Sequence, residues 1–187
     1  NPTGYAQVLE EHVSLDSQPS TLNRFYTYGL DLISQSTLDP QPSTVFFGYD
    51  GHGSTRLLTD ANGAVTDTYT YDAFGTLLAQ TPDPIPKTLY LYAGEQWDPD
   101  LGLYYNRARY LNPDTGRFWS MDTHEGTSQD PLSLHKYLYC GANPLNGVDP
   151  SGYETLAEMN ATSFMQNYLQ GGFASVAGNF AVQRVLG

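Results

Sequence analysis

The sequence has one cysteine, few basic residues and no long apolar run, and each of these absences excludes a class of protein. Cys140 alone cannot build an internal disulfide framework or a metal cluster made of several cysteines. No stretch approaches the ~18 consecutive apolar residues of a membrane-spanning helix, and no basic-then-apolar leader opens the chain. We therefore expect no membrane span in this sequence.

The shortage of basic residues argues against nucleic acid as a partner. Eight lysines and arginines stand against twenty aspartates and glutamates, which gives a net charge of −12. A chain this acidic repels a phosphate backbone.

Metal and cofactor motifs are also missing. The four histidines lack any close His-x-His or His-x3-His spacing (His12, His52, His124 and His135). Residues 60–67 are rich in oxygen donors but lack the calcium-loop pattern with its closing glutamate, so they are interpreted as a hairpin turn. We predict no cofactor.

What the sequence has in abundance is tyrosine, glycine and proline. Fifteen tyrosines, eighteen glycines and twelve prolines favour many short strands joined by tight turns, so we predict an all-β fold. Tyrosine recurs in a Y-x-Y frame, whose spacing places both rings on one face of a strand. The frames are Tyr26/Tyr28, Tyr69/Tyr71, Tyr90/Tyr92 and Tyr137/Tyr139.

A repeat runs through "GYDGHGSTRLLTDANGAVTDTYTYDAFG". Its pattern predicts strands over residues 55–59 and 65–71, joined by a two-residue hairpin turn at Asn62-Gly63. Tyr49-Asp50 returns as Tyr71-Asp72, 22 residues later. Repeats of this length indicate stacked units. Because the chain also begins at Asn1 without methionine, we expect it to be a piece of a longer protein.

From Glu154 onward the pattern changes. Leu156, Met159 and Phe164 have helix-compatible spacing, and Gly171-Gly172 interrupts it. This segment is too short for a core of its own, so we predict that it begins another domain or lies along the β-structure.

The stretch "NPLNGVDPSGYE" precedes that change. Taken alone, its Asp149-Pro150-Ser151-Gly152 favours a plain turn, because proline fixes φ and glycine tolerates positive φ. The sequence that precedes this stretch favours a role for it beyond that of a turn.

Residues 49–75 resemble the YD repeat of the Rhs family, and "GLYYNRARYLNPDTGRFWSMD" resembles the Rhs repeat-associated core. The resemblance extends from about Phe25 to Tyr153. The residues on which the resemblance rests are, in order, Gly102-Leu103-Tyr104-Tyr105, Arg107-Ala108-Arg109-Tyr110, Pro113, Gly116-Arg117-Phe118, Pro144, Asp149-Pro150, and Gly152-Tyr153.

The resemblance implies a long β-sheet wound into a hollow shell that encloses a toxic carboxyl-terminal cargo. It implies YD-repeat strands over residues 1–95, a core domain over 96–153 that closes the shell, and the start of cargo or linker over 154–187. The implied partners are the cargo, the preceding YD repeats of the same chain, and immunity or delivery proteins. The implied location is the bacterial surface or the medium.

In many family members the core is an aspartyl protease that cuts its own chain once. Carried over, Asp122 and Asp149 would be the catalytic pair, Arg117 would orient a carboxylate, and the scissile bond would be Tyr153–Glu154. Pro144, Pro150 and Gly152 complete the motif. Two close carboxyl groups can share one proton, so that one activates water while the other acts as an acid.

One difference from the usual pattern of the family leaves a second hypothesis open. The first aspartate commonly lies in a DPxG turn, whereas Asp122 is followed by Thr123-His124-Glu125-Gly126 without proline. The second hypothesis is therefore a non-catalytic YD-repeat scaffold or adhesin, whose exposed aromatic rings could bind carbohydrate. Cleavage of the full-length chain distinguishes the two.

Overall fold

A computed structural model describes residues 7–14, 21–38, 42–81, 86–126, 128–129 and 131–153, which fold almost entirely into strands and turns. The predicted all-β class is confirmed. The helix predicted after Glu154, and Glu154 itself, lie outside the described residues.

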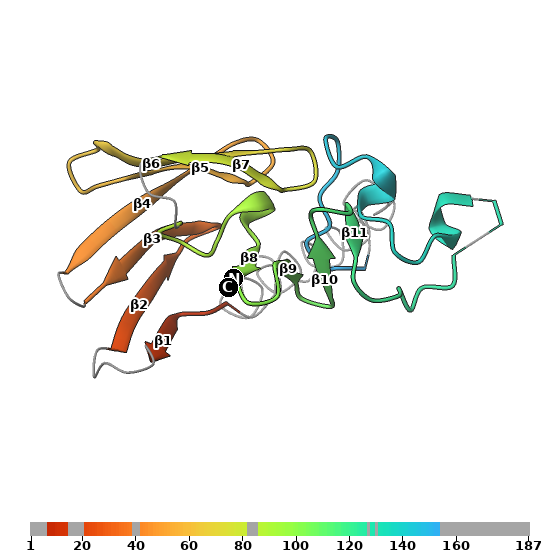
Figure 1. The fold of residues 1–187 in the computed structure, drawn as a ribbon, viewed down its shortest axis with the longest axis horizontal. Coiled ribbons are helices and arrows are strands. Elements are labelled where there is room, and N and C mark those ends of the chain that lie inside the picture. Colours follow the sequence, from red (N-terminus) through yellow and green to blue (C-terminus); the bar gives the residue numbers. More distant parts are fainter. Residues whose placement is uncertain are drawn as a thin grey trace, which may run out of the picture.

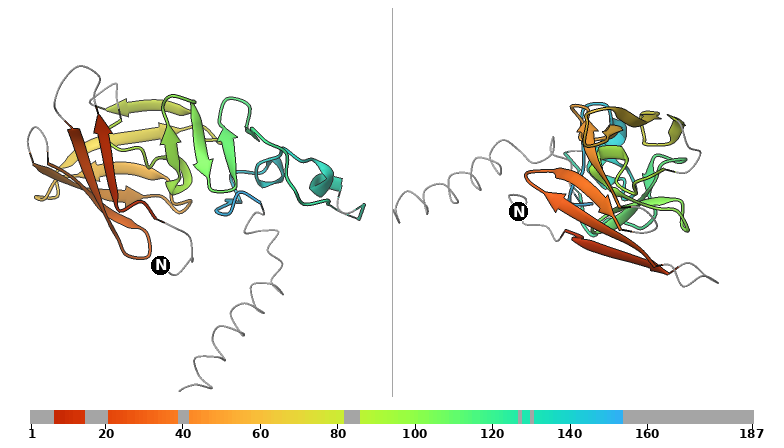
Figure 2. Two further views of the ribbon diagram at one scale, coloured as in Figure 1. Left: turned by 90° about the horizontal axis from the view of Figure 1, so that it is seen from below. Right: turned by 90° about the vertical axis from the view of Figure 1, so that its left-hand side faces the viewer.

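Seven antiparallel strands form the first sheet in chain order, so that each strand pairs with its neighbours in sequence. They are β1 (Glu10–Ser14), β2 (Thr21–Tyr28), β3 (Leu32–Thr37), β4 (Ser43–Tyr49), β5 (Thr55–Thr59), β6 (Val65–Tyr71) and β7 (Leu77–Thr81). The sheet curves around the light-green segment that follows β7 (Figures 1 and 2). Gln35 and Thr55 donate side-chain hydrogen bonds to carbonyl groups of this segment, those of Lys87 and Tyr90.

A smaller antiparallel sheet of four strands lies beside the end of the first (Figure 1). It contains β8 (Gln96–Asp98), β9 (Leu103–Asn106), β10 (Arg109–Asn112) and β11 (Arg117–Phe118). Three short 3-10 helices complete the described elements: η1 (Tyr92–Gly94), η2 (Pro131–Leu134) and η3 (Cys140–Ala142). The described residues between 119 and 153 are otherwise turns and irregular backbone.

The turns after β4, β5 and β6 repeat one local arrangement. In the middle turn the Asp60 carboxylate accepts hydrogen bonds from the N–H groups of Asn62 (2.8 Å) and Ala64 (2.9 Å). Gly63 takes the positive φ of 82° that closes the loop. Asp50 and Asp72 make the same two bonds, and Gly53 and Gly75 take the same backbone conformation.

This arrangement corrects the predicted two-residue turn at Asn62-Gly63. β5 and β6 have the predicted bounds, but their connection spans residues 60–64. The longer loop forms because the Asp60 side chain bonds backbone N–H groups that a tighter turn would leave in a different position.

Two of the four Y-x-Y frames lie on strands as predicted, Tyr26/Tyr28 on β2 and Tyr69/Tyr71 on β6. The strand prediction is wrong for the other two. Tyr90/Tyr92 leads into η1, and Tyr137/Tyr139 leads into η3. Packing explains both exceptions, because the rings of Tyr92 and Tyr139 meet in the core (6.4 Å between centroids) without needing a strand to place them.

One hydrophobic core joins the two sheets. It contains Leu58 and Tyr71 from the first sheet, Tyr104 and Leu111 from the second, and Tyr139 from the turn before η3. Its tyrosines bury their rings while several hydroxyl groups donate to backbone carbonyls: Tyr71 to Thr55 (2.9 Å), Tyr92 to Ala73 (2.8 Å) and Tyr104 to Gly75 (2.9 Å). Phenylalanine would leave these backbone carbonyls without their donors, which explains the preference for tyrosine.

Candidate active site

The turn between β9 and β10 lies alongside the loop Asp149–Gly152, called the DPSG loop below, and forms hydrogen bonds to it residue by residue. Asn106 to Arg109 donate in order to the carbonyl oxygens of Asp149 to Gly152, and Arg109 also reaches the carbonyl of Tyr153. The bonds are Asn106 Nδ2 to Asp149 (3.1 Å), Arg107 Nη1 to Pro150 (2.5 Å), Ala108 N to Ser151 (3.4 Å), Arg109 Nε to Gly152, and Arg109 Nη2 to Tyr153 (3.5 Å). All five carbonyls of residues 149–153 are therefore held.

This close approach requires glycine at position 152. Gly152 has a φ of +75°, which side chains rarely adopt, and a Cβ there would lie 2.1 Å from the carbonyl oxygen of Asn106. The motif glycine thus brings two backbones together.

Asp149 is the buried end of this loop, with 3% of its surface exposed. Its Oδ1 accepts bonds from Ser151 N (3.2 Å), Ser151 Oγ (3.0 Å) and Gly152 N (2.8 Å). Burial raises the pKa of the Asp149 carboxyl above its ordinary value, although these bonds and Arg109 oppose the rise. A carboxyl group of this kind can hold a proton at higher pH than a surface aspartate.

Asp122 sits in a turn that forms without proline. Its Oδ1 accepts a bond from His124 N (2.8 Å), and its own N–H donates to the Lys136 carbonyl (2.9 Å). Gly126 takes a φ of +74°, and a Cβ there would collide with the Ser133 carbonyl. The side-chain bond to the residue two positions on is the one that Asp149 makes, so this turn aims its carboxylate without the DPxG sequence.

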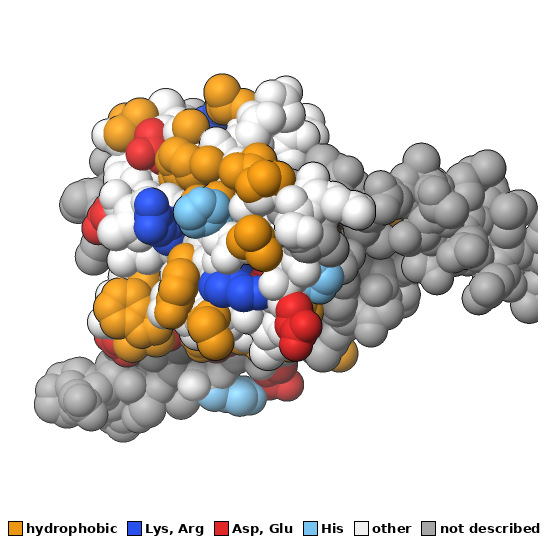
Figure 3. Space-filling view, turned by 90° about the vertical axis from the view of Figure 1, so that its right-hand side faces the viewer, with side chains coloured by type: hydrophobic (Ala, Val, Ile, Leu, Met, Phe, Trp, Pro, Cys, Tyr) orange, Lys and Arg blue, Asp and Glu red, His pale blue; other side chains and the backbone are white. Residues whose placement is uncertain are grey.

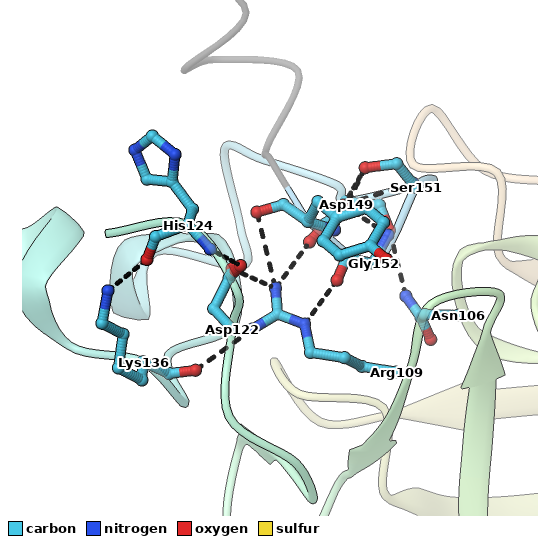
Figure 4. A network of polar contacts seen from close by, with 9 residues as sticks. Asn106, Arg109, Asp122, His124, Lys136, Asp149, Ser151 and Gly152 are labelled. Atoms are coloured by element: carbon cyan, nitrogen blue, oxygen red, sulfur yellow. Dashed lines mark hydrogen bonds and ion pairs between the residues drawn. The ribbon is translucent and has the colours of Figure 1, made fainter. Parts of the chain in front are cut away.

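Arg109 brings the two aspartates together (Figure 4). Its Nη2 lies 2.9 Å from Asp122 Oδ2 and 3.6 Å from Asp149 Oδ2. The guanidinium stacks over the Phe118 ring (3.7 Å) and donates from Nη1 to the Lys136 carbonyl (3.1 Å). Because the same Nη2 reaches the Tyr153 carbonyl, one nitrogen atom contacts both carboxylates and the predicted scissile peptide group.

Arg117, the arginine predicted to orient a carboxylate, lies elsewhere. On β11 its side chain is exposed, whereas that of Phe118 is buried, since neighbouring residues of a strand face opposite sides. The arginine between the carboxylates is Arg109, which belongs to the motif Arg107-Ala108-Arg109-Tyr110 and was not among the predicted site residues. A buried strand position for an arginine is the signal that could have identified it.

The remaining motif residues lie in two places. Pro150 and Gly152 belong to the DPSG loop, and Pro144 lines an open cavity of about 400 Å³ beside Asp50, His52 and Arg56. Tyr153 is half exposed.

Among the described residues no group of three or more His, Cys, Asp or Glu side chains could hold a metal ion. Nor do they contain a helix long and apolar enough to cross a bilayer.

A second ion pair lies behind the DPSG loop. The Glu95 carboxylate meets Arg107 Nη1 at 2.7 and 2.8 Å, and this is the nitrogen that bonds the Pro150 carbonyl. Glu95 is 6% exposed, and burial raises its pKa to about 7, against the opposing effect of Arg107.

Comparisons with known proteins place this chain beside large bacterial toxins. No family model matches it. The tRNA nuclease WapA of Bacillus subtilis is 34% identical over 143 residues, which is 76% of this chain and 6% of that protein. The double-stranded DNA deaminase toxin A of Burkholderia cenocepacia is 28% identical over 153 residues, 74% of this chain and 10% of the toxin.

Solved structures show the same fold. A TcdB2–TccC3 structure matches 71% of this chain and 7% of its own, with a TM-score of 0.60 and 24% identity. A Tc holotoxin pore of Photorhabdus luminescens matches 71% of this chain and 6% of its own, with a TM-score of 0.58 and 22% identity. The chain thus spans a small fraction of its relatives, is similar in sequence to part of WapA, and has a fold found in Tc toxins.

Proposed function

We propose that this chain is the end of an Rhs-type shell that encloses a toxic cargo and frees it by cutting the Tyr153–Glu154 bond. The shell would be closed by residues 96–153, preceded by YD-repeat strands over 1–95 and followed by cargo or linker from 154. Seven strands paired in chain order, with aspartate-capped loops after β4, β5 and β6, support the repeat part of this proposal.

The differing names of the relatives support a carrier role. One is a tRNA nuclease and another is a DNA deaminase, yet each is similar to about three quarters of this chain. Two unrelated chemistries do not share one active site, so the common segment is better interpreted as the container than as the toxin.

The surface of residues 119–153 supports contact with further protein. Large apolar side chains are exposed there, and Figure 3 shows hydrophobic groups distributed over this end of the molecule. The exposed residues include Trp119, Met121, Leu132, Leu134, Tyr137 and Leu145. Apolar exposure on this scale marks interaction surfaces, which suits the end of a shell.

One observation carries the proteolytic part: Arg109 Nη2 contacts Asp122, Asp149 and the Tyr153 carbonyl together. In the proposed reaction Asp149, whose pKa is raised by burial, acts as the acid, and Asp122, paired with Arg109, acts as the base. Asp122 takes a proton from water as the water oxygen attacks the Tyr153 carbonyl carbon. Arg109 stabilises the negative charge that develops on the carbonyl oxygen.

The tetrahedral intermediate then collapses. Asp149 gives its proton to the nitrogen of Glu154, and the carbon–nitrogen bond breaks. The products are a new carboxyl group on Tyr153 and a new amino group on Glu154, so one water molecule is consumed. Apo sites often show longer contacts than the reacting complex, which fits the 3.5 Å distance to the Tyr153 carbonyl.

The location and partners follow from the same proposal. A shell that delivers a toxin acts at the cell surface or outside the cell, with delivery proteins outside and an immunity protein in the producing cell. The only substrate would be its own chain.

Denaturing electrophoresis of the full-length protein tests the proposal. We expect two pieces, with the second beginning at Glu154 by amino-terminal sequencing. A single uncut wild-type band would overturn proteolysis and favour the non-catalytic scaffold or adhesin.

A further inference from the structure

A partly buried ion pair connects the residue after η1 to the DPSG loop. Glu95 stands directly after η1, and its N–H donates to the Tyr92 carbonyl (3.0 Å). Its carboxylate meets Arg107, whose Nη1 also donates to the Pro150 carbonyl. The path thus leads from η1 through two side chains to the loop that carries Asp149.

The η1 end of this path is fixed to the first sheet. Thr55 of β5 donates from its N–H to the Leu91 carbonyl (2.9 Å) and from its hydroxyl to the Tyr90 carbonyl (2.7 Å). Ser54 Oγ accepts the N–H of Ala93 (2.9 Å). Glu95 can therefore hold its position only when residues 90–95 are docked on the turn after β4.

The backbone of Arg107 provides an independent sign of function. Arg107 has a φ of +58°, a conformation that is strained for a non-glycine residue. Glycine would adopt it without strain, and asparagine with less. An arginine in this position is explained by what its guanidinium does, which is to join Glu95 to the Pro150 carbonyl.

We propose that Glu95 and Arg107 are positioning residues that make cleavage depend on docking of residues 90–95 against the first sheet. This inference rests on the proposed self-cleavage. Without the docked segment Glu95 does not hold Arg107, and the DPSG loop loses the donor at Pro150, next to Asp149. The shell would then cut its chain only after its last repeats have folded.

The charged groups around Glu95 give the pair a measurable signature. Arg107 faces it from the β9–β10 turn and Asp149 from the DPSG loop, and Tyr28 of β2 faces Arg107. Because the pKa of Glu95 is raised to about 7, ionisation of Glu95 should add a component to the pH profile of cleavage that rises through neutrality, against the loss of the Asp149 proton at higher pH.

The experiment compares Glu95→Gln with wild type in the full-length protein. Loss of a hydrogen-bonded charge should slow cleavage at least ~10-fold and flatten the pH profile near neutrality. Glu11→Gln is the matched control, since it removes a carboxylate that pairs with Arg24 (3.2 Å) between β1 and β2 and contacts neither residues 90–95 nor the DPSG loop. It should lower thermal stability and leave the cleavage rate within a factor of about two.

Hydrogen exchange separates this inference from the proposed function. In an Asp122→Asn background, adding Glu95→Gln should speed amide exchange in residues 149–153 by ~10-fold. Unchanged exchange, or wild-type cleavage by Glu95→Gln with its pH profile intact, would overturn the positioning role while self-cleavage stands. An uncut wild type with faster exchange in the double variant would refute self-cleavage and retain the coupling of Glu95 to the loop.

Discussion

The Asp60 turn of the first sheet and the Asp149 turn beside the second use similar local geometry in opposite environments. Both carboxylates accept backbone N–H bonds from residues that follow them. At the surface, these bonds lower the pKa of Asp60. At Asp149 burial outweighs the same kind of bond and raises the pKa. An aspartate turn therefore becomes chemically useful through its surroundings rather than through its sequence.

The largest difference between the two kinds of turn should appear on removal of the carboxylate. Asp149→Asn or Asp122→Asn should slow cleavage by ~10²–10⁴-fold, because each removes a proton-transfer group. Asp72→Asn changes an exposed turn of the repeat type and serves as the control. Time courses of the appearance of the two fragments measure the effect. An equal loss of cleavage in Asp72→Asn would show that Asp122 and Asp149 act only by stabilising the fold, as an aspartate of an ordinary turn does.

The arginines beside these turns extend the comparison. Arg109→Lys keeps the charge but loses the planar fork that spans Asp122, Asp149 and the Tyr153 carbonyl, so cleavage should fall ~100-fold. Arg56 pairs with the turn residue Asp50 at the surface (2.8 Å). Arg56→Lys and Arg117→Lys should cleave like wild type. A stronger effect of Arg117→Lys than of Arg109→Lys would contradict the assignment.

The glycines of the two turns, Gly152 and Gly63, should differ in how much stability their substitution costs. Gly152→Ala forces a positive φ and a collision with the Asn106 carbonyl, so it should destabilise the fold by ~3 kcal/mol and slow cleavage. Gly63 has a φ of +82° but open space around its Cα, so Gly63→Ala should cost about 1 kcal/mol. Thermal unfolding of the full-length variants compares them. Similar costs would mean that the backbones of Asn106 and Gly152 are not tightly apposed.

The smallest expected effect is the pH dependence of stability caused by Glu95. Its pKa is about 7 in the folded chain and near 4.5 when unfolded, so the folded state retains a proton that the unfolded state releases in this range. The free energy of unfolding should therefore fall by ~2 kcal/mol as pH rises from about 4.5 to about 7. Glu95→Gln should lack this contribution in denaturant titrations, and an identical slope in both proteins would contradict the buried, proton-binding Glu95.

Local sequence patterns predicted the fold well where one interaction dominates. β5 and β6 have their predicted bounds, because alternating residues and flanking Asp and Gly turns act within a few positions. Tyr90/Tyr92 and Tyr137/Tyr139 carry the same Y-x-Y spacing without forming strands. Their rings are placed by contacts across the core, which no local window contains.

By itself the sequence determined the all-β class, the bounds of β5 and β6, and the proposal that Asp122 and Asp149 act together. Tertiary structure decided which arginine joins them. Arg109 reaches the DPSG loop across 43 residues, whereas Arg117, much closer to Asp122 along the chain, points outward. The reason is geometric: strand alternation sets the direction of each side chain, and only the pairing of the β9–β10 turn with the DPSG loop brings Arg109 between both carboxylates.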